Sequence, residues 1–186
     1  MLLLVGLGNP TPNSNNNRHN VGFKIVDAIN QKFGLSKQKP KFKGLLTTGT
    51  IGDKKIYAIK PLTFMNNSGI CIRELLEYFK MDAEDVIVFH DDLDVEFGKI
   101  KAKFGGSSAG HNGIASIDKF IGKDYSRVRI GIGKPENKIS ISDYVLNDFS
   151  DDEQEHLEKI TSNIIDSLSI LIDKKLDLFS STVNNN

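Results

Sequence analysis

Apolar residues recur along the chain with two different spacings. Unbroken apolar runs at residues 2–8 and 86–89 are typical of strands buried on both faces of a sheet. Other segments carry apolar side chains three and four positions apart, which is the spacing of one helix face. Helices are therefore expected at residues 19–33, 66–79, 112–121 and in two stretches after residue 150, and further strands at residues 45–51, 55–59, 99–104 and 127–132.

The order of these elements predicts an α/β fold. We expect a single domain with a twisted, mixed, mainly parallel sheet and helices on both faces. It would span residues 1–182, with residues 183–186 as a flexible asparagine-rich tail and residues 37–43 as a basic loop. Ligands of such sheets bind beyond the carboxyl ends of the strands, so Asn9 and Asp91 can meet at one edge of the sheet.

The composition places the chain in a reducing compartment without a membrane span. Cys71 is the only cysteine, so no internal disulfide can form. No apolar run is long enough to cross a bilayer, and the first residues lack the basic region of a signal peptide. We therefore expect a cytoplasmic protein.

Charge is unevenly distributed although the formal net charge is zero. Residues 99–134 contain eight basic and two acidic residues, a net +6, whereas residues 143–178 contain three lysines and ten acids, a net −7. The basic segment suits contact with a polyanion such as RNA. It could equally be a solvated surface that the acidic C-terminal helices balance.

Asparagine recurs in three glycine-rich or apolar turns, each with a histidine nearby or expected at the same edge. These segments are VGLGNP followed by RHN, then TFMNNSG, and finally GHNG. An asparagine amide both donates and accepts hydrogen bonds, so several of them suit a neutral carbonyl substrate. A histidine that moves protons would complete a hydrolase for an ester or amide. Taken alone, Asn66 is most simply the N-cap of its helix.

Three histidines compete for the role of base. His19 lies at the start of a predicted helix, where the helix dipole favours the neutral form, but spacing does not exclude His90 or His111. One carboxylate of the His-Asp-Asp-Leu-Asp segment at residues 90–94 could orient the base. The same carboxylates could hold magnesium, although the surrounding asparagines favour a metal-free site.

No cofactor is expected. A Gly-Leu-Gly turn follows the first strand, but Thr11 occupies the third glycine position of a dinucleotide-binding fingerprint and Pro10 disrupts the helix start. The chain also lacks a phosphate-binding loop of the Walker type and the zinc-binding His-Glu-x-x-His pattern. The glycines could simply serve a tight turn with unusual backbone angles, or the turn could orient the amide of Asn9 towards a cleft.

Six motifs together resemble the bacterial-type peptidyl-tRNA hydrolases. They are VGLGNP, RHNVGF, PLTFMNNSG, FHDDLDV, GGSSAGHNG and RVRIGIGKP, in the family's order over about three quarters of the chain. The resemblance implies a monomeric, metal-free enzyme without an obligate protein partner. Its activity would be hydrolysis of the ester between a peptide and the 3′-terminal ribose of tRNA, and its partner would be the acceptor end of peptidyl-tRNA.

The resemblance also assigns roles to individual residues. His19 corresponds to the catalytic base, Asp91 to the acid that orients it, and Asn9 to a polarising amide. The expected substrate-binding residues are Met65, Asn66, His111 and Asn112. The expected tRNA-binding cations are Lys101, Lys103 and Arg129.

One position departs from the family pattern. Ser14 stands where the family usually has a tyrosine, within the altered segment at residues 11–17. A ring at this position would contact the terminal nucleotide, so substrate affinity is expected to differ here.

Two alternative functions remain open at this stage: a non-catalytic RNA-binding module on the same scaffold, and a general esterase or peptidase. The second has little support, because no Gly-x-Ser-x-Gly motif is present.

Overall fold

The computed structural model describes all 186 residues and contains one seven-stranded sheet in the order β2-β3-β4-β1-β5-β7-β6. The four central strands β4, β1, β5 and β7 are parallel, whereas β2, β3 and β6 run antiparallel to their neighbours. The strands are β1 (Leu2–Gly6), β2 (Lys39–Lys41), β3 (Gly44–Ile51), β4 (Lys54–Pro61), β5 (Val86–Asp92), β6 (Ile100–Phe104) and β7 (Ser126–Gly131).

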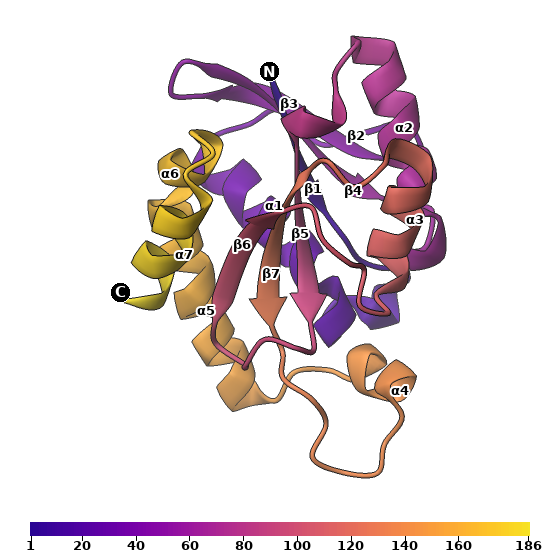
Figure 1. Ribbon diagram of the computed structural model, residues 1–186, viewed down its shortest axis with the longest axis vertical. Helices are drawn as coiled ribbons and strands as arrows, with labels where there is room; N and C mark the ends of the chain where they lie inside the picture. Colours follow the sequence, from indigo (N-terminus) through magenta and orange to yellow (C-terminus); the bar gives the residue numbers. More distant parts are fainter.

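Helices cover both faces of this sheet, as expected for the predicted fold class (Figure 1). Two helices lie on one face, four on the other, and α4 lies beyond the ends of β5 and β7. The α-helices are α1 (Val21–Lys32), α2 (Ser68–Phe79), α3 (Asn112–Ile121), α4 (Ile141–Leu146), α5 (Asp151–Asp166), α6 (Leu168–Ile172) and α7 (Leu176–Asn184).

The core is divided into two layers by the sheet. Along β1, Leu2 and Leu4 face the layer formed with α1, α5, α6 and α7, whereas Leu3 and Val5 face the layer formed with α2 and α3. All four are buried, which explains why the strand lacks an alternating polar pattern. The acidic C-terminal helices α5, α6 and α7 therefore pack on the same face of the sheet as α1.

Helix α1 approaches the sheet unusually closely, because glycines face each other at the contact. A Cβ atom on Gly6 would overlap the backbone of Gly22, and a Cβ on Gly22 would overlap the backbone of Phe89 and Leu7. The backbone N–H of Phe23 donates to the carbonyl of Leu7 at 3.2 Å. This contact brings the start of α1 within reach of the carboxyl end of β5.

Helix α7 covers the outer edge of β6. The side-chain amide of Asn184 donates to the carbonyl of Ile100 and accepts its N–H, both at 2.9 Å. The hydroxyl of Ser180 accepts the N–H of Ala102 at 2.8 Å. The backbone groups that an edge strand leaves unpaired are thus bonded within the same chain.

Several local predictions need correction. The segment expected as a loop at residues 37–43 contains β2, which pairs with β3. The helix expected from residue 19 begins at Val21, after a 3₁₀ turn at Arg18–Asn20. Asn66 is not an N-cap, because it lies within the 3₁₀ turn Met65–Asn67 that precedes α2. The predicted flexible tail is partly helical, since α7 extends to Asn184.

No helix in the structure is both long and apolar enough to cross a membrane.

We predict that Gly22→Ala destabilises the protein by about 1–3 kcal/mol, because the added methyl group meets backbone atoms that cannot move independently. Urea unfolding followed by circular dichroism measures the change. The matched control is Gly49→Ala, where the methyl group meets mainly the flexible side chain of Leu35. Equal stability of the Gly22 variant and the wild type would contradict the close-approach explanation.

Candidate functional site

A cavity of about 700 Å³ opens at the carboxyl ends of the parallel strands. Its walls come from the segments after β1 and β4, the end of β5, the loop before α3, and α4. The residues lining it include Asn9, Ser14, His19, Met65, Asn66, Asp91, Asp92, His111 and Asn112. The structure therefore brings together all seven residues that were expected to be catalytic or substrate-binding, and Ser14 beside them.

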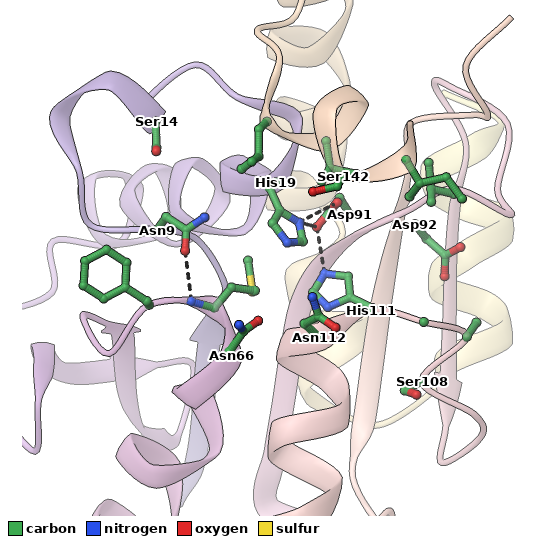
Figure 2. A pocket seen from close by; sticks show the side chains of 18 of the residues that line it. Asn9, Ser14, His19, Asn66, Asp91, Asp92, Ser108, His111, Asn112 and Ser142 are labelled. Atoms are coloured by element: carbon green, nitrogen blue, oxygen red, sulfur yellow. Dashed lines mark hydrogen bonds and ion pairs between the residues drawn. The ribbon is translucent and has the colours of Figure 1, made fainter. Parts of the chain in front are cut away.

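His19 is oriented by Asp91 at the base of this cavity (Figure 2). Its Nδ1 atom lies 3.0 and 2.9 Å from the two carboxylate oxygens of Asp91. A carboxylate only accepts hydrogen bonds, so Nδ1 of a neutral His19 carries the proton and Nε2 keeps a lone pair. This is the tautomer that a general base requires.

His111 bonds the same carboxylate, with its ring centroid 4.8 Å from that of His19. Its Nδ1 accepts the backbone N–H groups of Gly113 and Ile114 at 3.1 and 3.2 Å and caps α3. The ring proton therefore lies on Nε2, which donates to Oδ1 of Asp91 at 2.8 Å. The capping role distinguishes His111 from His19, and it was not apparent from spacing.

Electrostatics favour a charged Asp91. Burial alone would raise the pKa of this carboxyl, but the nearby His19 and His111 outweigh it and hold the pKa well below its usual range. For His19, burial lowers the pKa, while the charge of Asp91 and the hydrogen bond to it raise the pKa above its ordinary value. The expectation that a helix start biases His19 towards the neutral form is therefore wrong in direction.

His90 is excluded as the base by its surroundings. Its side chain is buried, and Nδ1 donates to the backbone carbonyl of Asp91 at 2.7 Å. Burial, together with the nearby His111, lowers the pKa of His90 to about 3. His90 does not line the cavity and stays neutral beneath it.

Asn9 is fixed in a way that leaves its amide nitrogen free. Its Oδ1 accepts the backbone N–H of Met65 at 2.9 Å, and this bond fixes the orientation of the side-chain amide, whose Nδ2 stays available at the cavity. The buried side chain of Asn20 bonds the backbone N–H and C=O of Asn9 at 2.8 and 2.9 Å. Sequence reasoning missed Asn20, although it directly follows His19.

The turn before Met65 has a strained backbone. Phe64 adopts φ 60° and ψ 157°, a region that residues with a Cβ rarely occupy and that costs about 1–3 kcal/mol. This conformation lets the N–H of Met65 bond Asn9, and it leaves the Phe64 side chain 55% exposed beside the cavity. Asn66 and Asn112 are exposed at the same cavity and offer further amides.

The predicted cations lie outside the cavity, on β6 and β7. Lys101 and Lys103 are two positions apart, so both project from the same face of β6, and Arg129 is opposite Lys101 in the register. Arg129 pairs with Asp92 at 2.7 Å. Arg127 belongs to the basic segment but is buried against Asp118, so it cannot contact a polyanion.

The sequence analysis also missed helix α4 and its contact with the turn Arg18–Asn20, which carries His19. Val145 and Leu146 line the cavity, and the backbone N–H of Arg18 donates to the carbonyl of Asn147. The guanidinium of Arg18 lies 4.2 Å from the ring centroid of Tyr144. Because α4 has only six residues and one buried side chain, it leaves no apolar periodicity that would predict it.

The site is better suited to proton transfer than to metal binding. The side chains of His19, Asp91 and His111 place possible ligand atoms within 4.8 Å of one another. A metal needs the lone pair of an imidazole nitrogen, yet both nitrogens that face Asp91 carry protons. The lone pair on Nδ1 of His111 is already bonded to backbone N–H groups. Only Nε2 of His19 is free to act as a base.

Comparison with a family model of peptidyl-tRNA hydrolases gives a match over residues 3–186. A peptidyl-tRNA hydrolase of Pelagibacter ubique is 82% identical over 185 residues and matches along the whole of both chains. A peptidyl-tRNA hydrolase of a Wolbachia strain from Drosophila simulans is 49% identical over 88% of this chain and 91% of its own.

A solved structure agrees with these sequence matches. The crystal structure of peptidyl-tRNA hydrolase from Acinetobacter baumannii superposes with a TM-score of 0.91 at 32% identity. The match covers 99% of this chain and 94% of that one. The predicted single-domain α/β fold and the predicted family resemblance are both confirmed.

We predict that histidine titration followed by NMR gives His19 a pKa above its ordinary value and that Asp91→Asn moves it down, because burial then acts without the opposing charge. His90 is expected to remain neutral between about pH 5 and 8 in the wild type. The control variant Asp94→Asn changes an exposed carboxylate of the same segment. An unchanged His19 pKa in Asp91→Asn would contradict the assigned pair.

Proposed function

The chain belongs to the peptidyl-tRNA hydrolase family, and we propose that it hydrolyses the ester of peptidyl-tRNA with His19 as the general base. The observation that carries this proposal is the His19–Asp91 pair, which places the proton of the neutral ring on Nδ1 and leaves the lone pair of Nε2 beside the cavity. Nε2 takes a proton from water as the water attacks the ester carbonyl. Asp91 stabilises the imidazolium that forms, and the proton can then pass to the departing ribose oxygen.

The asparagine amides stabilise the charge that develops on the carbonyl oxygen. Nδ2 of Asn9 is the best-placed donor, because Met65 and Asn20 fix the rest of that residue. Fixed donors of this type are worth about 3 kcal/mol each in other hydrolases. Asn66 and Asn112 would bond the peptide backbone, and Met65 and His111 would complete the binding site. Backbone contacts of this kind allow any side chain on the peptide.

The acceptor end of tRNA is proposed to extend over β6 and β7. Lys101, Lys103 and Arg129 share one face of these strands and would bind phosphates, which position the substrate without reading its sequence. We further propose that the enzyme acts as a cytoplasmic monomer that recycles tRNA released from stalled ribosomes. The free, buried Cys71 is consistent with a reducing compartment.

The geometry argues against the two alternatives. A non-catalytic RNA-binding module would not need a buried carboxylate that selects one tautomer of His19. An esterase that used a cysteine nucleophile would need an accessible thiolate. Cys71 is buried, and burial raises the pKa of its thiol to about 12.

We predict that the protein releases tRNA from N-acetyl-aminoacyl-tRNA and that His19→Ala lowers kcat by about 10²–10⁴-fold. Unblocked aminoacyl-tRNA should resist cleavage, because it lacks the acylated backbone amide that Asn66 and Asn112 would bond. His156→Ala is the matched control, since His156 lies on α5 away from the cavity. Binding of the blocked substrate without release of tRNA would instead identify a binding module.

A second prediction concerns the residue that departs from the family pattern. Ser14 lines the cavity, and its hydroxyl lies 2.5 Å from that of Thr11. We predict that Ser14→Tyr lowers KM with little change in kcat, because an aromatic ring can stack on the terminal base. Ser14→Leu is the control, as it adds apolar volume without an aromatic face. An unchanged KM in Ser14→Tyr would refute a role for this position.

A further inference from the structure

The carboxylate of Asp92 is held rigidly between two donors. Its Oδ1 accepts the backbone N–H of Asp94 at 2.8 Å, and its Oδ2 accepts Nε of Arg129 at 2.7 Å. The side chains of Asp92 and Arg129 are only 10% and 19% exposed. The pair is therefore partly shielded from water, which strengthens it relative to a surface ion pair.

Arg129 keeps one edge of its guanidinium available. Only Nε is bonded, and neither Nη atom is among the buried polar atoms that lack a partner, so both reach solvent. The neighbouring Arg127 differs, since its two Nη atoms are engaged by Ser107 and Asp118 inside the protein. Of these two arginines on one face of β7, only Arg129 has free donors with which to bind an external anion.

An arginine bound through Nε has a fixed guanidinium plane. A free arginine loses side-chain entropy when it grips a phosphate, and a fixed one has already lost most of it. The two Nη donors lie in one rigid plane and are spaced to bond two phosphate oxygens at once, a fixed geometry that a lysine ammonium lacks. Asp92 thus supplies the orientation that a two-point phosphate contact needs.

We propose that Asp92 is a positioning residue for substrate: it orients Arg129 so that the Nη edge receives a phosphate of the tRNA acceptor end. This inference rests on the proposed function, in which Arg129 binds phosphate. Asp92 follows Asp91 directly in β5, and the side chains of successive strand residues point to opposite faces. Figure 2 shows the Asp92 carboxylate directed away from the His19–Asp91 pair.

The two adjacent aspartates thereby fix the position of the proposed base relative to the proposed phosphate-binding arginine. Asp91 orients the base, while Asp92 orients the cation that would hold the phosphate. Both carboxylates are fixed to one short segment of a central strand, so the distance between the water-activating group and the phosphate contact is set by the backbone. A substrate with its phosphate at that distance from the ester is favoured over other esters.

A double-mutant cycle tests the inference. Asp92→Ala, Arg129→Ala and the double variant are compared on N-acetyl-aminoacyl-tRNA and on N-acetyl-aminoacyl-adenosine, a 3′ ester that lacks phosphates. We expect Asp92→Ala to raise KM for the tRNA substrate about tenfold, or about 1.4 kcal/mol, with kcat unchanged. KM for the adenosine ester should not change. In the Arg129→Ala background, loss of Asp92 should add nothing further.

Two additional variants keep the result interpretable. Asp92→Asn retains an oxygen that accepts from Nε, so its KM should rise less than that of Asp92→Ala. Glu77→Ala is the matched control, because it removes the carboxylate from another arginine pair, Arg73–Glu77, which lies on the solvent-exposed face of α2. Its KM should equal that of the wild type, and thermal unfolding confirms that the Asp92 variants are folded.

The contrary outcomes separate the inference from its premise. If Arg129→Ala leaves KM for the tRNA substrate unchanged, the phosphate role of Arg129 in the proposed function is wrong, and the inference fails with it. If Arg129→Ala raises KM but Asp92→Ala does not, or lowers it, only the positioning role is wrong. An equal effect of Asp92→Ala with and without Arg129, or on the adenosine ester, would also overturn it.

Discussion

The site depends on one buried negative charge, the carboxylate of Asp91. A carboxylate removed from water is costly unless several donors surround it. Here the donors come from two imidazoles on separate segments, His19 before α1 and His111 at the start of α3. The charge therefore holds three parts of the chain together while it orients the ring of His19, the proposed base.

The packing of the sheet makes this meeting possible. Gly6 and Gly22 let α1 approach β1 so closely that the turn before the helix lies over the end of β5. The side chain of Asn20, in the same turn, bonds the backbone of Asn9 and so fixes Asn9 relative to this turn. His19, the proposed base, and Asn9, the proposed polarising amide, are thus positioned by one short segment, so their relative geometry does not rely on a flexible loop.

The sequence predicted the layers, most of the strands and the residues that gather at the cavity, because each leaves a local signal. Unbroken apolar runs marked the parallel strands, and the six motifs identified the family. The features that the sequence could not resolve, such as the different roles of the two histidines, depend on tertiary contacts. His19 and His111 look equivalent in sequence, and only the bonds from the start of α3 to Nδ1 of His111 distinguish this helix cap from His19, the proposed base.

The basic segment illustrates the same limit. Arg127 and Arg129 are two residues apart and indistinguishable by composition, yet one is sealed against Asp118 and the other keeps a free edge. Asp118 lies nine residues before Arg127 on a helix, so the pairing depends on how α3 packs against β7. Net charge along the sequence therefore overstated the number of cations that can meet RNA.

The contact between α7 and β6 has a consequence for how the chain is made. Asn184 bonds the edge of a strand that begins at Ile100, so this edge of the sheet stays open until the segment around residue 184 has been synthesised. Domains fold as their chain emerges from the ribosome, and an uncovered strand edge invites pairing with other chains. A chain of this peptidyl-tRNA hydrolase would itself be left with an unprotected sheet edge if its own translation stopped short of α7.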